Sequence, residues 1–117
     1  MGQQRNSDRG RGRRVKLMAD YGAFPLWGIE ARPGDYEWSG MLSPEQLPLS
    51  AELVKQLEQW ATSHDETLGP TFEWLSEAAR KAFVDEGWRL LRLVQAELGP
   101  AGYEVVYYNE ITGRLEE

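Results

Sequence analysis

The sequence predicts an α+β fold in which a small sheet of two or three strands is covered on one face by a hairpin of two helices. Two observations predict this fold. Apolar residues alternate with a period of two at 15–21, and a second strand-like segment rich in Val and Tyr lies near the other end of the chain, at 103–111. Between these segments, residues 50–98 carry two apolar stripes of helical period, separated by Gly69-Pro70. The expected order is therefore strand, long loop, helix, helix and strand.

The chain of 117 residues is long enough for one domain with one hydrophobic core. We divide it into a flexible basic arm at 1–14, a single α+β domain at 15–112 and a polar tail at 113–117. The arm is rich in Gly, Arg, Asn and Gln and has no apolar period, so nothing in it offsets the entropy cost of ordering.

The first strand, at 15–21, alternates apolar or aromatic residues with residues that face the opposite side. Residues 23–48 then hold four of the six prolines, and the aromatic run at 21–27 cannot form a helix. We expect a long loop here, with a short strand at 35–41. Ser43-Pro-Glu-Gln predicts a capping box that opens one helical turn.

The first long helix follows Ser50, the expected N-cap, and Leu49 is placed to contact Val54 as a hydrophobic staple. Polar residues occupy its opposite side, and Gly69-Pro70 ends it. Its apolar stripe comprises Leu53, Val54, Leu57, Trp60 and Ala61.

The second helix begins near Thr71 or Ser76 and ends at Leu98, before Gly99-Pro100. Gly87 in its middle costs about 1 kcal/mol relative to alanine, so we expect a packing reason for it. The close approach of Trp60 from the first helix is the candidate.

The last strand, at 103–111, carries apolar or aromatic groups on both faces. Two strands alone are marginally stable in water. We therefore expect either a third strand from 35–41 or a homodimer in which the sheet edge pairs with that of a second copy.

Charge divides the chain into two parts. Residues 1–16 hold six Arg or Lys and one Asp, and this +5 within a total of −6 leaves −11 on the rest of the chain. An acidic surface attracts basic proteins and repels nucleic acid, although acidic surfaces also serve solubility alone. Nucleic acid is therefore expected to bind, if at all, through the flexible arm, whose arginines include Arg9, Arg11, Arg13 and Arg14.

Several chemistries are excluded or disfavoured. The chain has no cysteine, so thiol nucleophiles, zinc–thiolate sites and disulfides are absent. No calcium loop, phosphate loop or nucleophile elbow occurs, and we expect no metal and no cofactor. His64 is the only histidine, and because neighbouring residues on a helix point apart, we do not expect it to form a dyad with Asp65.

No stretch approaches the roughly 18 apolar residues that a membrane span needs, and no signal-peptide core follows the basic N-terminus. We therefore expect a cytoplasmic protein without a membrane anchor. An alternative start at Met18 would make the arm an upstream extension.

Asp20 is the best catalytic candidate, because it follows the first strand beside aromatic residues that would desolvate it. The structural alternative is that its carboxylate caps the turn at Gly22. An enzyme or a small-molecule binder would use a pocket around Asp20, Tyr21 and Trp27.

The segments "LMADYGAFPLWG", "LPLSAELVKQLEQWATSHDETL", "DEGWRLLRLVQAELGP" and "YEVVYY" carry a resemblance. The chain resembles a group of small uncharacterised bacterial proteins with an ADYG…PLW segment, a Leu-Pro-Leu-Ser helix start and a closing Tyr-x-Val-x-Tyr strand. The resemblance covers residues 15–110 and implies a common domain without indicating a reaction.

These observations together predict a non-enzymatic protein-binding domain, immunity-like or antitoxin-like, that presents an acidic face and exposed aromatic rings to a basic partner such as a nuclease. Trp and Tyr suit this role because they bury a large area at low entropy cost. The predicted contact residues are Asp20, Tyr21, Phe24, Trp27 and Trp38.

Overall fold

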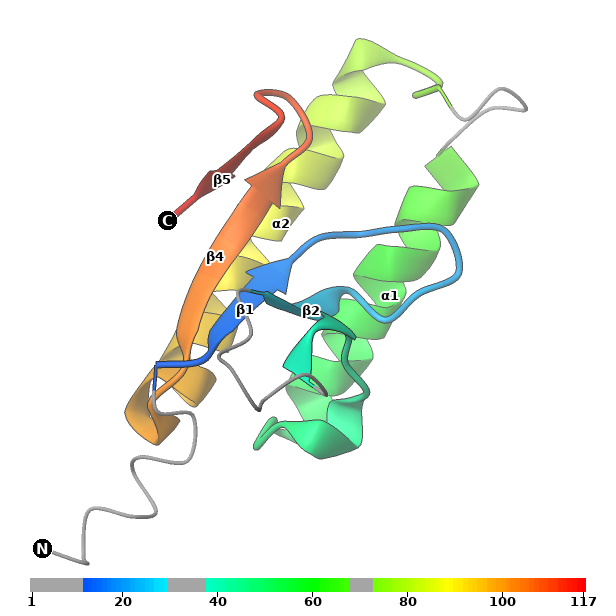
Figure 1. Ribbon diagram of the computed structural model, residues 1–117. Helices are drawn as coiled ribbons and strands as arrows, with labels where there is room; N and C mark the ends of the chain where they lie inside the picture. The colour runs from blue at the N-terminus through cyan, green and yellow to red at the C-terminus, as the bar shows by residue number, and fades with distance from the viewer. Residues whose placement is uncertain (1–11, 30–37, 68–72) are drawn as a thin grey trace, which may run out of the picture.

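The computed structural model describes residues 12–29, 38–67 and 73–117. Within them, five strands and two long helices form an α+β structure (Figure 1). The strands are β1 (Arg14–Leu17), β2 (Leu26–Ile29), β3 (Gly40–Met41), β4 (Glu104–Asn109) and β5 (Arg114–Glu116). The helices are α1 (Ala51–Thr67) and α2 (Glu77–Leu98), with the short 3-10 helices η3 (Pro44–Gln46) and η4 (Gly99–Ala101).

The strands form one mixed sheet in the order β3-β2-β1-β4-β5. The central pair, β1 and β4, is parallel, and the other three pairs are antiparallel. Both long helices lie on the same side of the sheet (Figure 1). The predicted α+β class and helical hairpin are therefore confirmed, whereas the predicted sheet of two or three strands is too small.

Two strands lie in segments where the sequence predicts none. β2 lies within the expected loop at 23–48 and pairs antiparallel with β1, with Leu17 opposite Leu26. β5 lies in the predicted polar tail and pairs with β4 after a turn in which Gly113 has a φ of 69°. Of the strand expected at 35–41, β3 is present at Gly40–Met41, and residues 30–37 lie outside the described part.

The extra strands give a sheet of five strands within one chain. A homodimer joined through the sheet edge was expected because two strands alone are marginally stable, and that reason no longer applies. The sheet also begins before Met18, since Val15 and Leu17 in β1 are 0% exposed. An alternative start at Met18 would delete this buried strand. In the part of the chain that the structure describes, no helix has the length and apolar character to cross a membrane.

The N-terminal caps of both helices agree with the sequence prediction, whereas Gly69-Pro70, expected to end the first helix, lies outside the described residues. The Ser50 hydroxyl accepts a hydrogen bond from the Leu53 amide (3.2 Å), and the Ser76 hydroxyl accepts one from the Ala79 amide (3.0 Å). The Ser50 amide and hydroxyl also donate to the Glu97 carboxylate, each at 2.7 Å. This contact joins the start of α1 to the end of α2 and holds the two helices antiparallel.

The centre of the core lies where α1, α2 and β4 meet. Trp60 stacks on Phe83 with ring centroids 4.3 Å apart and donates from its indole nitrogen to the Phe83 carbonyl (3.0 Å). Tyr107, which is 0% exposed, closes the same space from the sheet. These rings pack with buried aliphatic side chains from both layers, which include Val15, Leu17, Leu26, Leu57, Leu90, Leu91, Val94 and Leu98.

Gly87 lies against these rings, which confirms the expected packing reason. A Cβ at this position would lie 2.6 Å from the Tyr107 Cζ atom and 2.9 Å from the Trp60 Cζ2 atom, and closer still to the Tyr107 hydroxyl. These distances are shorter than van der Waals contact, so only glycine lets the helix approach both rings.

Replacing Gly87 by alanine should therefore destabilise the protein, although alanine has the higher helix propensity. We expect the free energy of unfolding to fall by about 1–3 kcal/mol, as for other overpacked cores. Urea denaturation followed by circular dichroism measures this. The matched control is Gly99→Ala, because a Cβ at Gly99 meets no atom within 4 Å. If the two variants were equally stable, the packing argument would be wrong.

Candidate functional site

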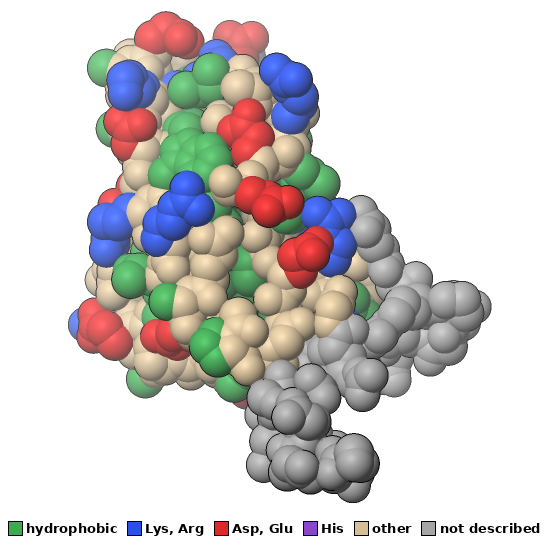
Figure 2. All heavy atoms as spheres, turned by 90° about the vertical axis from the view of Figure 1, so that its left-hand side faces the viewer, with side chains coloured by type: hydrophobic (Ala, Val, Ile, Leu, Met, Phe, Trp, Pro, Cys, Tyr) green, Lys and Arg blue, Asp and Glu red, His purple; other side chains and the backbone are tan. Residues whose placement is uncertain are grey.

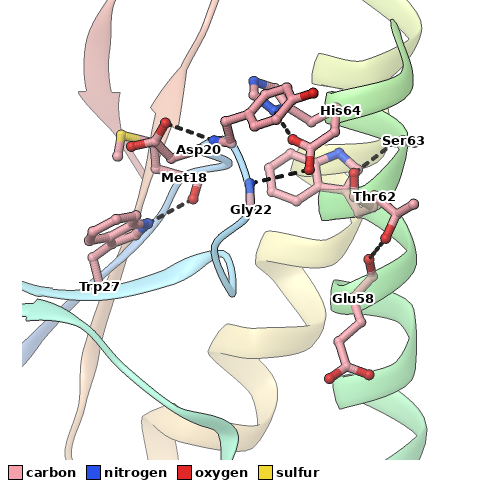
Figure 3. Close-up of polar contacts among 11 residues, drawn as sticks. Met18, Asp20, Gly22, Trp27, Glu58, Thr62, Ser63 and His64 are labelled. Carbon is pink, nitrogen blue, oxygen red and sulfur yellow. Dashed lines mark hydrogen bonds and ion pairs between the residues drawn. The ribbon is translucent and has the colours of Figure 1, made fainter.

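The turn between β1 and β2 reaches across α1 (Figures 1 and 3). The Gly22 amide in this turn donates a hydrogen bond to the Asp65 carboxylate near the end of α1 (3.2 Å). A hollow of about 360 Å³ lies between the two elements. Its turn side is formed by Gly22, Ala23 and Phe24, and its helix side by Glu58, Ala61, Thr62 and Asp65.

Asp20 acts within the turn itself. Its carboxylate accepts a hydrogen bond from the Tyr21 amide (2.8 Å), and its carbonyl accepts one from the Ala23 amide (3.1 Å). Asp20 is exposed and does not line the hollow. This geometry matches the turn-capping alternative and supplies no desolvated carboxylate for catalysis.

The predicted aromatic contact residues divide between several places. Tyr21 is 60% exposed at the tip of the turn, and Phe24 lines the hollow while packing against the core. Trp27 lies on the sheet, away from α1 (Figure 3), where its indole nitrogen donates to the Met18 carbonyl (2.9 Å). Asp20, Tyr21 and Trp27 therefore line no common pocket among those found in the described residues.

Trp38 belongs to the core and is only 4% exposed. Its indole nitrogen donates to the Arg14 carbonyl (3.0 Å), and its ring stacks on Tyr103 with centroids 5.6 Å apart. The Arg13 guanidinium covers the ring at 4.9 Å. The sequence prediction of Trp38 as an exposed contact residue is corrected by this burial.

The basic arm is described only at its end. Arg9 and Arg11 lie outside the described residues, whereas Arg14 belongs to β1 and forms an ion pair with Glu104 (2.6 Å). Arg13 lies on Trp38, and its carbonyl accepts from the Glu104 amide (2.9 Å). Arg13 and Arg14 are thus held by the fold, and binding of phosphates through the arm remains a prediction.

Charge is distributed differently on the two helices. On α2, three ion pairs join Glu77 to Arg80, Asp85 to Lys81 and Glu86 to Arg89. The side of the molecule in Figure 2 likewise shows acidic and basic side chains interspersed with apolar ones. By contrast, α1 carries four carboxylates and one lysine. Of these carboxylates, Glu52, Glu58 and Glu66 form no ion pair with any described residue.

The sequence analysis did not select Glu58, Asp65 or Glu66. A signal for them exists, because Glu58 and Asp65 are seven residues apart and therefore lie on the same side of a helix. The position of the turn beside them depends on the tertiary structure. Together, the exposed side of α1 and the turn at 20–24 form what we call the acidic surface.

His64 lies behind this surface and is 7% exposed. Its Nδ1 atom lies 3.2 Å from the Asp65 carboxylate, so the expectation that these neighbours point apart is wrong. The ring also contacts Trp74 and Phe83, at centroid distances of 5.6 and 5.4 Å. No three His, Cys, Asp or Glu side chains in 12–29, 38–67 and 73–117 are grouped as a metal site requires.

Glu110 follows β4, and its pKa depends on its burial and on nearby charged groups. Burial raises its pKa above the ordinary value of 4.5, the charges of His64 and Arg80 oppose the rise, and the Asp20 carboxylate adds to it. The end of β4, the turn and the end of α1 are thus electrostatically coupled.

Removing the Asp65 carboxylate should release the turn from α1. We expect amide hydrogen exchange at Gly22 to become about fivefold faster in Asp65→Ala, which corresponds to roughly 1 kcal/mol for one hydrogen bond. Exchange measured by NMR tests this, with Glu66→Ala as the control. The Ala23 amide, which donates within the turn, is the internal reference. Equal exchange rates at Gly22 in both variants would contradict the inference that the Asp65 carboxylate holds the turn against α1.

Glu110 should make the protein less stable as the pH rises. Because its pKa is higher in the folded state, the folded protein binds more protons, and stability is lost from about pH 4.5 upward. The free energy of unfolding of the wild type, measured relative to that of Glu110→Gln, should therefore decrease between about pH 4 and about pH 7. Urea titrations across this range measure the difference. Glu52→Gln on α1 is the control. If the free energies of unfolding of the wild type and Glu110→Gln changed in parallel with pH, the raised pKa of Glu110 would be wrong.

Comparison with known proteins identifies a family. No curated protein matches the chain. A family model described as Serratia CdiI immunity protein-like matches residues 13–110, which contain both helices and β1 to β4. The resemblance to a group of small bacterial proteins is confirmed at the level of a family. The chain therefore belongs to the Serratia CdiI immunity protein-like family.

Proposed function

We propose that this chain is an immunity protein that neutralises a toxin by covering it with the acidic surface. Membership of an immunity protein family bears out the sequence prediction of an immunity-like, protein-binding domain. One observation supports the choice of surface. The exposed side of α1 carries Glu52, Glu58 and Glu66, which form no ion pair with any described residue, and a single lysine, Lys55.

Unpaired carboxylates favour a basic partner for a physical reason. Three ion pairs on α2 already engage most of its charged side chains, so a toxin gains little by approaching that helix. The carboxylates of α1 instead create a negative potential that accelerates encounter with a positive surface and orients it. The partner surface is therefore rich in lysine and arginine.

The hollow beside α1 supplies a specific receptor within this field. Glu58 and Asp65 line it from the helix, and the Phe24 ring lines it from the turn. Carboxylates and an aromatic face are the groups that bind a guanidinium or an ammonium ion. A lysine or arginine side chain of the toxin enters this hollow in the proposed complex.

Tyr21 adds an apolar contact at the rim. Its ring is 60% exposed, and the Asp20 and Asp65 hydrogen bonds hold the turn that carries it. A preordered tyrosine buries a large area while losing little entropy. Of the five contact residues predicted from the sequence, Tyr21 and Phe24 are retained in this proposal as direct contacts and Asp20 as the turn cap.

Charge reversal tests the proposal directly. In Glu58→Lys/Glu66→Lys, we expect the affinity for the toxin that this chain neutralises to fall about tenfold or more, because attraction becomes repulsion. Isothermal titration calorimetry at low and high salt measures the loss, and wild-type binding should weaken with salt.

The matched control is Glu117→Lys, which places a lysine at the exposed C-terminal residue beyond β5. It should retain wild-type affinity and protect cells that express the toxin. Equal affinities for the α1 variant, the control and the wild type would reject the acidic surface as the interface. Absence of any toxin binding by the wild type would reject the function.

A further inference from the structure

A second hollow lies on the opposite flank of α1, between α1 and α2. Its volume is about 400 Å³, and it is lined by Trp60, Ala79, Ala82 and Phe83 and by the polar residues Gln56, Gln59, Ser63, Glu86 and Arg89. This volume is at the lower end of the range for ligand pockets and suits one large side chain. We call it the interhelical groove.

Two stacked rings form the floor of the interhelical groove. The Trp60 and Phe83 rings are nearly parallel, at 8°, and each is at most 5% exposed. The indole nitrogen of Trp60 is already bonded to the Phe83 carbonyl, so the rings are fixed before any partner arrives. The short side chains of Ala79 and Ala82 leave the space above the floor open.

The rim of the groove carries no unbalanced charge. Arg89 donates to both oxygens of Glu86 (2.9 and 2.6 Å) and to the Gln56 side chain (2.7 Å). This network neutralises the only two charged residues that line the groove. A neutral ring therefore fits the groove better than the cationic side chain that fits the hollow on the other flank.

Gln59 offers a polar group at the edge of the groove. No hydrogen bond joins its amide to another described side chain, and it also lines a shallow hollow on α1 with Lys55, Glu58, Thr62 and Glu66. The groove is therefore continuous with the acidic surface. A partner that covers α1 reaches the aromatic floor without further movement.

We infer that the interhelical groove receives a tyrosine or tryptophan side chain of the toxin. The inference rests on the proposed function, since the occupant belongs to the same partner. The ring lies beside Ala79 and Ala82, against the small part of Trp60 and Phe83 that lines the groove, and its hydroxyl or indole N–H bonds to Gln59. Aromatic rings of this kind are the usual anchors of protein interfaces, where they fill preformed pockets.

The toxin is then recognised at two points on either side of one helix. A cationic side chain enters the hollow between α1 and the turn, and an aromatic side chain enters the interhelical groove. The diameter of a helix with its side chains is about 10–12 Å, so the two anchors are separated by about that distance. This spacing defines the pattern that the toxin surface must present.

A small probe tests the groove without the toxin. N-acetyltyrosinamide titrated into the full chain should shift the NMR signals of the Gln59 and Ser63 amides and of the Trp60 indole. Ala82→Trp fills the groove and should abolish these shifts. Ala96→Trp, at an exposed position on the same helix outside the groove, should leave them unchanged. Shifts that are absent, or that persist in Ala82→Trp, would overturn the inference.

The toxin then tests the occupant. We expect Ala82→Trp to weaken toxin binding about tenfold or more, as loss of an aromatic anchor does, and Ala96→Trp to have no effect. If Ala82→Trp binds as tightly as the wild type while Glu58→Lys/Glu66→Lys does not, the acidic surface stands and the groove inference fails. If probe binding instead competes with self-association in sedimentation experiments, a second copy is the occupant and the inference is overturned. If the wild type does not bind the toxin, the proposed function and this inference both fail.

Discussion

The contact of Trp60 with Phe83, Gly87 and Tyr107 is the constraint on which the rest of the structure depends. It joins α1, α2 and β4, and therefore fixes the distance between the helices and their position on the sheet. The same ring pair is the floor of the interhelical groove. The groove is thus a by-product of core packing, and its aromatic lining is as rigid as the core.

The position of α1 also decides where the acidic surface lies. Its inner side is buried through Leu53, Leu57 and Trp60, so the carboxylates on its outer side are necessarily exposed. The turn between β1 and β2 is then drawn to the helix by the bond from Gly22 to Asp65. Asp65 therefore holds the turn beside α1 and, with Glu58, lines the hollow between them.

The aromatic residues around the first strand have different tasks, although they are close in sequence. Trp38 and Tyr103 stack within the core, and Trp27 covers the sheet beside Lys16. Tyr21 instead lies at the tip of the turn, where it is 60% exposed. The many aromatic residues of this segment therefore serve mainly to pack the fold. Which of their side chains is exposed depends on which residue lies at the tip of the turn.

The sequence by itself determined what depends on local interactions. The helices, their caps at Ser50 and Ser76, and the first and last strands of the prediction follow from spacing and side-chain chemistry within a few residues. A glycine within a helix indicated close packing at position 87, but the rings that it meets, Trp60 and Tyr107, belong to distant segments. Only the tertiary structure decided the rest. β2 and β5 are too short to be evident without the strands they pair with, and burial of Trp38 requires Tyr103 from a distant segment. The acidic surface needs α1 and the turn, which are more than forty residues apart at Gly22 and Asp65, and no local pattern encodes such a contact.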